Sequence, residues 1–480
     1  MVHAGMLCYF TVKRIDGGEL MKKYPLTAAQ NMHYQWIRKY GTQQVSGLSI
    51  VASLQADLDF TLLEKCILME IKRYSCMRVQ FTKPDSNGNI KQYISSAGTY
   101  EIPIKDLSDM TMEEADNTMQ SWAYKTIDGD DIPMFEIFMV KLPEGYRGFF
   151  LHMDHRLIDS CGVVVMTNDI MSLYTHFKFG SEMPENLADF EEVLLKDLSK
   201  TKNEKRFQRD KNFWDNILDK LGEPIYSDIQ GPLTLDRARR KHNNPNLRAA
   251  DIELKDLFVA VEDYKLEPDS SKTLYDFCQN HQISMTNLLL LGMRTYLSKV
   301  NNGQTDISIQ NFISRRSTQD EWTSGGSRTI MFPCRTKISP NTDFLSAAQE
   351  IQDMQNQIYL HSNYDPQLIY DEIKKRYHTP DNTTYESCYL TYQPLTAKMD
   401  NPYLKDIPMH SKWFANGAAT KKMYLTVSHT EDGGMNFSYH YQTADLNEKH
   451  VELFNYYLMR IIFRGVEQPN LTVGEIMAAV

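Results

Sequence analysis

The chain has 480 residues, of which 42% are apolar and 24% charged, and its formal net charge is −10. This composition is typical of globular domains and argues against long disorder, while the length predicts two or three domains. The acidic balance argues against nucleic acid as a partner, and no apolar run is long enough to span a bilayer. Seven scattered cysteines without a Cys-x-x-Cys pair indicate reduced thiols in a cytoplasmic protein.

The first half alternates between helices and strands. Residues 1–20 lack caps and periodicity, so we expect an upstream extension with the true start at Met21. Helices are predicted at 28–40, 60–74, 114–123 and 163–177, with Thr27 and Asp59 capping the first two. Strands are predicted at 48–54, 77–82, 90–94, 135–142 and 148–153. Together these elements predict an α+β N-terminal lobe over residues 21–180.

The second half repeats this alternation after a connecting segment, residues 181–248. A charged helix is expected at 204–221, and the polar stretch 222–246 is interpreted as a linker. Further helices are predicted at 274–281, 286–300, 344–361 and 447–464, and strands at 306–313, 327–338, 386–393, 423–430 and 435–442. Residues 249–480 therefore form a predicted C-terminal lobe, and ligand sites often lie in a cleft between two such lobes.

A histidine stands at the corner where an apolar strand meets a helix, and an aspartate follows four residues later. These residues are His155 and Asp159. Asp159 or Ser160 can cap the helix, because a short side-chain oxygen accepts from unpaired backbone N–H groups. His155 then lies beside the positive end of a helix dipole, with an imidazole that titrates near neutrality.

Spacing alone does not identify a site, because His361 and Asp365 repeat it. There the aspartate precedes a proline and no strand leads in, which indicates a helix end running into a loop. A metal site of His152, Asp154 and His155 is a further alternative for the first corner. Strand alternation separates these three side chains and no fourth ligand is nearby, so we expect no metal.

The order of the motifs resembles that of the condensation domains of nonribosomal peptide synthetases, which belong to the chloramphenicol-acetyltransferase-like acyltransferase superfamily. Residues 25–30, Pro-Leu-Thr-Ala-Ala-Gln, are similar to the opening helix motif, and residues 73–78 to a degraded Arg-His-x-x-Leu-Arg. Further matches follow in the same order at residues 209–214, 235–239, 327–335, 392–393 and 426–441. The resemblance implies an α+β fold of two chloramphenicol-acetyltransferase-like lobes that form a pseudo-dimer with a cleft between them.

The active-site motif of this family, His-His-x-x-x-Asp-Gly, corresponds to residues 154–160. The resemblance implies that His155 is catalytic and that Asp159 is structural, paired with an arginine of the second lobe. Arg315 is the best match for that arginine, although a solvated strand end is the alternative for it and its neighbour. Asp154 and Ser160 stand where the family has its first histidine and its glycine.

The implied activity is acyl transfer. The donor would be an acyl or peptidyl thioester, on the phosphopantetheine arm of a carrier protein in trans or on coenzyme A, with no permanently bound cofactor. The acceptor would be an amine, giving an amide, or in second place a hydroxyl, giving an ester. We expect a monomer. The altered motif leaves one alternative open, a non-catalytic condensation-like docking module that recruits a partner protein.

The densest basic cluster consists of Arg237, Arg239, Arg240 and Lys241. Carrier proteins of this kind are usually acidic, so the cluster is a candidate carrier-binding surface. A solvated linker is the alternative interpretation.

Overall fold

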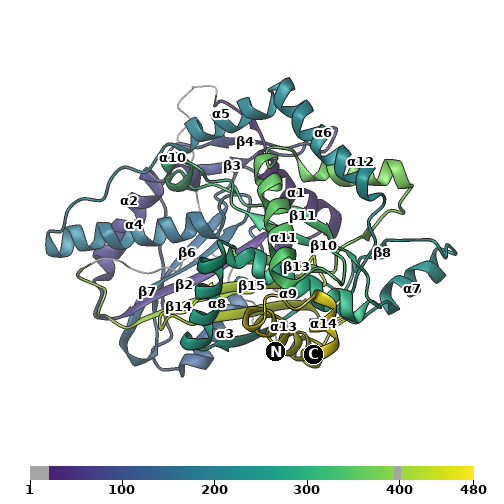
Figure 1. The fold of residues 1–480 in the computed structure, drawn as a ribbon. Helices are drawn as coiled ribbons and strands as arrows, with labels where there is room; N and C mark the ends of the chain where they lie inside the picture. The colour runs from purple at the N-terminus through teal and green to yellow at the C-terminus, as the bar shows by residue number, and fades with distance from the viewer. Residues whose placement is uncertain (1–20, 394–401) are drawn as a thin grey trace, which may run out of the picture.

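The computed structural model describes residues 21–393 and 402–480. The predicted upstream extension, residues 1–20, lies outside the described residues. Two large sheets, each covered by helices, form most of the described chain, and two small sheets of three and two strands complete it. The fold is α+β as predicted (Figure 1). Across the described ranges, no helix is long and apolar enough to cross a membrane.

The first sheet has five strands in the order β14-β2-β7-β6-β5. Their bounds are β14 Met409–Phe414, β2 Gly47–Gln55, β7 Tyr146–Asp154, β6 Phe135–Lys141 and β5 Ile104–Asp106. The β2, β7 and β6 strands pair antiparallel, whereas β5 runs parallel to β6. The edge strand β14 comes from the second half of the chain and pairs with β2 from Met409↔Leu54 to Phe414↔Ser49. The two predicted lobes therefore share a sheet.

Helices cover both faces of this sheet because its strands are apolar on both sides. Two helices, α2 (Phe60–Arg73) and α4 (Ser160–Phe179), pack on one face in a core with β2, β6 and β7. A third, α3 (Met112–Ala123), covers the other face. The first helix, α1 (Ala28–Tyr40), begins with the predicted capping box of Thr27 and Gln30. Shorter elements complete this half: β1 Tyr24–Pro25, β3 Val79–Phe81, β4 Lys91–Ile94, η1 Gln43–Ser46, η2 Ser75–Arg78 and η3 Pro143–Gly145.

The connecting segment is largely helical, with α5 Phe190–Thr201, α6 Glu204–Leu221 and α7 Leu233–Lys241. The linker prediction for residues 222–246 is wrong, because α7 packs there. Leu235 and Ala238, three residues apart on one face of α7, are buried in a small apolar cluster with Tyr226, Leu247 and Ala250. The nine-residue helix buries only two of its residues in this cluster. Two residues are too few to show a helical period of apolar positions in the sequence.

The second sheet has six strands in the order β11-β10-β13-β15-β16-β9. Their bounds are β11 Ile330–Lys337, β10 Asp306–Ile313, β13 Cys388–Gln393, β15 Met423–His429, β16 Met435–Gln442 and β9 Val259–Leu266. One face packs against α8 Pro268–His281, α9 Met285–Val300, α11 Phe344–Leu360 and α13 Glu448–Glu467. On β15 and β16 the opposite face carries half-buried polar residues, among them Tyr424, Thr426, Ser438 and His440.

The remaining elements are α10 Gln319–Thr323, α12 Pro366–Tyr377, α14 Val473–Ala479, β8 Ala250–Asp251 and β12 Thr383–Thr384. Several observed elements were not predicted, including α5, α12, β9, β14 and α14. The turn at His361 does end a helix as predicted, but Asp365 then caps α12 with its side chain on the Gln367 N–H. The aspartate of the second His-x-x-x-Asp motif is thus a helix cap.

Candidate active site

The corner between β7 and α4 holds His155 in a fixed backbone position. The His155 N–H donates to the Ser46 carbonyl at 2.6 Å, one residue past the end of β7. Asp159 is the N-cap of α4, and its Oδ1 accepts from the Gly162 N–H at 3.1 Å. Of the two predicted candidates, Asp159 and not Ser160 caps the helix. His155 therefore stands just outside the N-terminal end of α4, where the sequence predicted it.

Asp159 also joins the two halves of the chain through a buried ion pair with Arg316. The guanidinium donates to both carboxylate oxygens, at 2.8 and 2.7 Å, and the two side chains are 0% and 1% exposed. The backbone N–H groups of Arg328 and Thr329 and the Thr329 hydroxyl donate to Oδ2 as well, at 2.9, 3.0 and 3.0 Å. Every oxygen of this carboxylate is satisfied by the second half of the chain or by the helix it caps.

The predicted partner, Arg315, is wrong by one residue. Its guanidinium donates instead to Asn363 Oδ1 at 3.2 Å. Strand β10 ends at Ile313, and in extended chain just beyond it neighbouring side chains point to opposite sides. Only one of the two arginines can face Asp159, and that one is Arg316, which is therefore no solvated strand end.

The charge state of Asp159 follows from these contacts. Burial raises the pKa of the carboxyl, but the Arg316 charge and the hydrogen bonds outweigh it and hold the pKa below its usual range. A carboxylate so firmly ionised and paired is a poor proton acceptor. The geometry assigns Asp159 a structural part in this corner.

Asp154, which replaces the first histidine of the motif, contacts Ser46, the residue that binds the His155 backbone. Its carboxylate accepts from Arg156 Nε and Nη2 at 3.0 and 2.8 Å, from Gln43 at 2.6 Å and from the Ser46 hydroxyl at 3.1 Å. Burial raises the pKa of Asp154, but Arg156 more than offsets this, so the pKa lies below its usual value. Because Ser46 also accepts from the His155 N–H, this network fixes the segment against which the histidine is placed.

The His155 ring is stacked on a second imidazole. His33 of α1 lies parallel to it, with 4.2 Å between ring centroids and 16° between planes, and Trp36 contacts His33 edge-on at 4.9 Å. Burial lowers the pKa of His155, an effect that the nearby Asp159 charge offsets only in part, and lowers that of His33 further. Within the described ranges the His155 Nδ1 has no hydrogen-bond partner. The site therefore holds a neutral imidazole whose Nδ1 is buried and unpaired.

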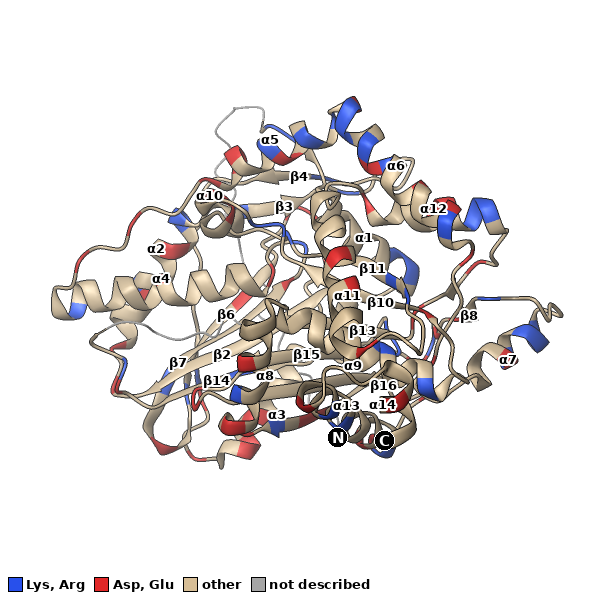
Figure 2. Cartoon of the chain, viewed as in Figure 1, with Lys and Arg blue, Asp and Glu red and all other residues tan. Residues whose placement is uncertain are grey.

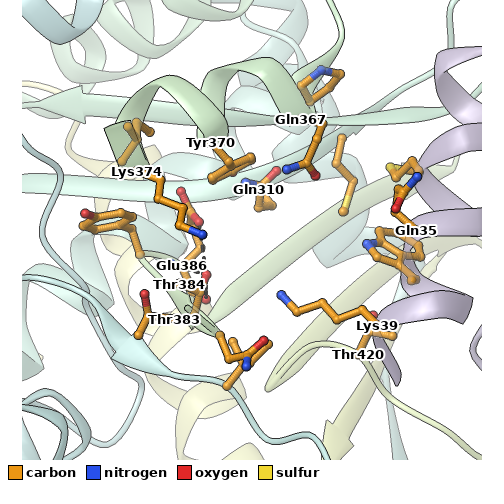
Figure 3. Close-up of a pocket in the computed structure, with 18 of the residues that line it drawn as sticks. Gln35, Lys39, Gln310, Gln367, Tyr370, Lys374, Thr383, Thr384, Glu386 and Thr420 are labelled. Atoms are coloured by element: carbon orange, nitrogen blue, oxygen red, sulfur yellow. Dashed lines mark hydrogen bonds between the residues drawn. The ribbon is translucent and has the colours of Figure 1, made fainter. Parts of the chain in front are cut away.

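A pocket of about 360 Å³ adjoins this stack, since Trp36 also lines it. Its walls come from α1, α12 and the segment from β12 to β13 (Figure 3). Lys421 lines it as well. The sequence analysis did not single out His33, Trp36 or Lys421. A histidine on the buried face of α1 gave no signal of its own, because its partner lies 122 positions further along the chain.

Two alternative chemistries find no support at this corner. Burial raises the pKa of the Cys161 thiol to about 11, so it is protonated and a poor nucleophile at neutral pH. His152 shares a hydrogen bond with the Ser49 hydroxyl at 2.8 Å. In residues 21–393 and 402–480, no group of three or more His, Cys, Asp or Glu side chains could hold a metal ion.

The basic cluster lies on α7, apart from His155. Arg239 donates to the Leu247 carbonyl at 3.0 Å and to Asp236 at 3.2 Å, and Lys241 pairs with Asp251 at 3.0 Å. These two side chains hold the helix in place. Arg237 is 63% exposed, with a long contact to Asp445 at 3.9 Å, and Arg240 has no ion-pair partner in the described part of the chain.

Comparisons with known proteins agree with this geometry. The Condensation domain family matches residues 21–479. A plipastatin synthase protein of Bacillus subtilis (strain 168) is 19% identical over 454 residues, which are 94% of this chain and 17% of that protein. The chain thus spans less than a fifth of that relative's length.

Solved structures share the fold. The first condensation domain of the calcium-dependent antibiotic synthetase, in complex with a substrate analogue, matches with a TM-score of 0.76 and 14% identity, covering 95% of this chain and 99% of that one. The starter condensation domain of rhizomide synthetase, in complex with C8-CoA, matches with a TM-score of 0.76 and 14% identity, covering 94% and 97%.

Replacing Asp159 with asparagine should destabilise the protein strongly. The substitution keeps the shape of the side chain but leaves Arg316 buried without a counter-charge, which costs about 3–5 kcal/mol at a fully buried pair. Urea unfolding and Tm measurements on Asp159→Asn test this. Arg315→Gln is the matched control. It should lose much less stability, because the Arg315 side chain makes one hydrogen bond, to Asn363. Equal losses in both variants would contradict the assignment of Arg316 as the partner.

Proposed function

We propose that this chain, which belongs to the condensation-domain family, is an acyltransferase that condenses a thioester donor with an amine acceptor. The observation that carries the proposal is the corner of His155 and Asp159. It keeps a neutral imidazole just before the start of α4, and the carboxylate beside it is fully paired. A module that only docks a partner has no need of such an arrangement.

In the proposed reaction the amine nitrogen attacks the thioester carbonyl carbon, and negative charge develops on the carbonyl oxygen. His155 accepts the proton that the nitrogen loses, the C–S bond breaks, and the thiolate leaves and is protonated. Orientation of the reactants and help with the developing charge supply the rest of the rate. No covalent intermediate with the enzyme is needed, which agrees with the protonated state of Cys161.

An amide product is favoured over an ester. A neutral amine attacks a thioester before it loses its proton, whereas a hydroxyl needs a base strong enough to remove its proton during attack. Burial makes His155 a weaker base than an exposed histidine. This property supports the amine as acceptor.

The donor is proposed to come from outside these residues, since the family match fills residues 21–479. A phosphopantetheine arm on a carrier protein, or coenzyme A, would present the thioester. The bound C8-CoA of the rhizomide synthetase domain supports a thioester of this kind. We further propose a monomer, because both halves of the site lie in one chain, and a cytoplasmic location, which the free thiols of the described cysteines support.

We propose that a carrier protein binds at the exposed face of α7, in particular at Arg237 and Arg240. Basic residues colour part of this helix blue in Figure 2. The helix packs on β8, and β8 pairs with β12, which lines the pocket. A carrier at α7 would therefore lie on the side of the molecule where the pocket lies. Since the chain is itself acidic, a local basic patch would have to overcome the repulsion between the two net charges.

His155→Ala should abolish transfer while leaving the fold intact. Loss of a group that accepts a proton in the transition state lowers kcat by ~10²–10⁴-fold. The measurement is product formation by mass spectrometry, with Tm as the check on folding. His361→Ala is the matched control, because this histidine has the same spacing to an aspartate but lies at the end of α11, where it stacks on Phe213 and contacts Asp210. Undiminished transfer in His155→Ala would favour the docking module.

The acid limb of kcat should lie below pH 6.5. Burial lowers the pKa of His155, so the imidazole stays neutral and able to accept a proton until the pH falls below the value for an exposed histidine. A pH profile with an acceptor amine of low pKa checks this, since the amine's own ionisation then does not intrude. A limb at or above pH 6.5 would argue against His155 as the base.

Reversing Arg237 and Arg240 to glutamate should raise the KM for a carrier-bound donor several-fold, with the effect shrinking at high salt. A small thioester without a carrier should react as before. The control reverses Lys272 and Lys449, two exposed lysines on α8 and α13, and changes the net charge equally. If both double variants behave alike, the long-range charge of the protein, and no site on α7, governs the encounter.

A further inference from the structure

The pocket beside the histidine stack contains a lysine that no acidic group balances. Lys421 is half-buried and lines the pocket, and it has no hydrogen-bond or ion-pair partner among the described residues. Its Nζ lies 4.3 Å from the ring centroid of Trp36, 4.9 Å from that of Phe312, 5.1 Å from that of Tyr424 and 5.4 Å from that of Tyr389. Four aromatic rings thus surround one ammonium group.

The neighbouring residue, Lys422, has the partners that Lys421 lacks. Lys422 is buried, and its Nζ donates to Asp228 at 2.6 Å, to Thr234 at 3.1 Å and to Gln230 at 3.2 Å. This ammonium has a counter-charge and a full set of acceptors. Lys421, one residue away, has neither a counter-charge nor a hydrogen-bond acceptor among the described residues.

Aromatic rings attract a cation but do not neutralise it. Each such contact offsets only part of the cost of taking an ammonium group out of water. Accordingly, burial lowers the pKa of Lys421 to about 7. An anion entering the pocket would supply both the missing counter-charge and the missing acceptors, and it would favour the protonated lysine.

The other lysines of the pocket occupy different places. Lys39 and Lys374 reach into the opening from opposite walls, α1 and α12 (Figure 3). Lys374 already pairs with Asp381. Lys421 lies over the ring of Trp36, which contacts His33, and His33 is stacked on His155. Its charge reaches both imidazoles, because it contributes to lowering the pKa of each.

We infer that Lys421 binds a carboxylate group of the acceptor, which is therefore an amine that also carries a carboxylic acid. This inference rests on the proposed function and names the class of acceptor. A single ammonium among apolar rings matches the single charge of a carboxylate. A phosphate on a phosphopantetheine arm is the other anion to consider, but it is a full arm length from its thioester, whereas only the rings of Trp36 and His33 separate Lys421 from His155.

Binding measurements test the inference without any acyl donor. The probes are the twenty standard amino acids, β-alanine and 4-aminobutyrate, each paired with its carboxamide, and phosphopantetheine paired with pantetheine. Calorimetric titration of the wild-type protein should show at least one acid bound 10-fold or more tightly than its amide. Lys421→Met should lose that preference, and Lys421→Arg, which keeps the charge, should retain most of it.

The matched control is Lys39→Met, which removes another lysine of the same pocket and should leave the preference unchanged. If no acid binds the wild-type protein better than its amide, the inference is wrong. It is also wrong if Lys421→Met and Lys39→Met lose the preference equally, or if only the phosphate probe depends on Lys421. In the last case the lysine binds the arm of the donor.

The same experiment separates this inference from the proposed function. His155→Ala should keep the preference for acids, because it leaves Lys421 in place, while losing transfer. Preference for acids in the wild-type protein together with no transfer from any thioester donor would leave the carboxylate site standing and would count against the acyltransferase. Transfer to amines without carboxylates, at undiminished kcat/KM, would support the acyltransferase and count against the carboxylate site.

Discussion

The buried pair of Asp159 and Arg316 is the interaction on which the site depends. Asp159 begins α4 in the first half of the chain, while Arg316 follows β10 in the second, 157 residues later. Two charges removed from water are tolerated only with good geometry and further hydrogen bonds, and here backbone N–H groups of Arg328 and Thr329 supply these bonds to Asp159. The pair therefore sets where the second half lies relative to the corner that carries His155.

Charges near His155 are compensated in small groups. Asp159 is paired with Arg316, and Asp154 with Arg156, so both carboxylates stay ionised, and their charges offset only part of the effect of burial on the His155 pKa. His155 is left neutral by burial and stacked on His33. Lys421 differs from these groups because it has no ion-pair partner among the described residues. It lines the pocket and lies over Trp36, which contacts the histidine stack.

The halves of the chain are joined by backbone as well as by charge. Strand β14 leaves the second half to pair with β2, and β2 is also the neighbour of β7, the strand that ends at the corner. The N–H of His155 donates to Ser46, immediately before β2. A displacement of the second half would therefore move β14 and, through β2, the strand β7 that ends beside His155.

Local structure at the site could be predicted from the amino-acid sequence. Apolar runs, a capping box at Thr27 and an aspartate at a strand-to-helix corner are short-range signals, and they placed α1, β7, α4 and His155 correctly. The sequence could not tell which arginine meets Asp159, that α7 is docked, or that Lys421 and not Lys422 lacks a counter-charge. In each case the deciding partner is distant in the chain, and neighbouring residues of the same type are equivalent until the fold points one of them inward.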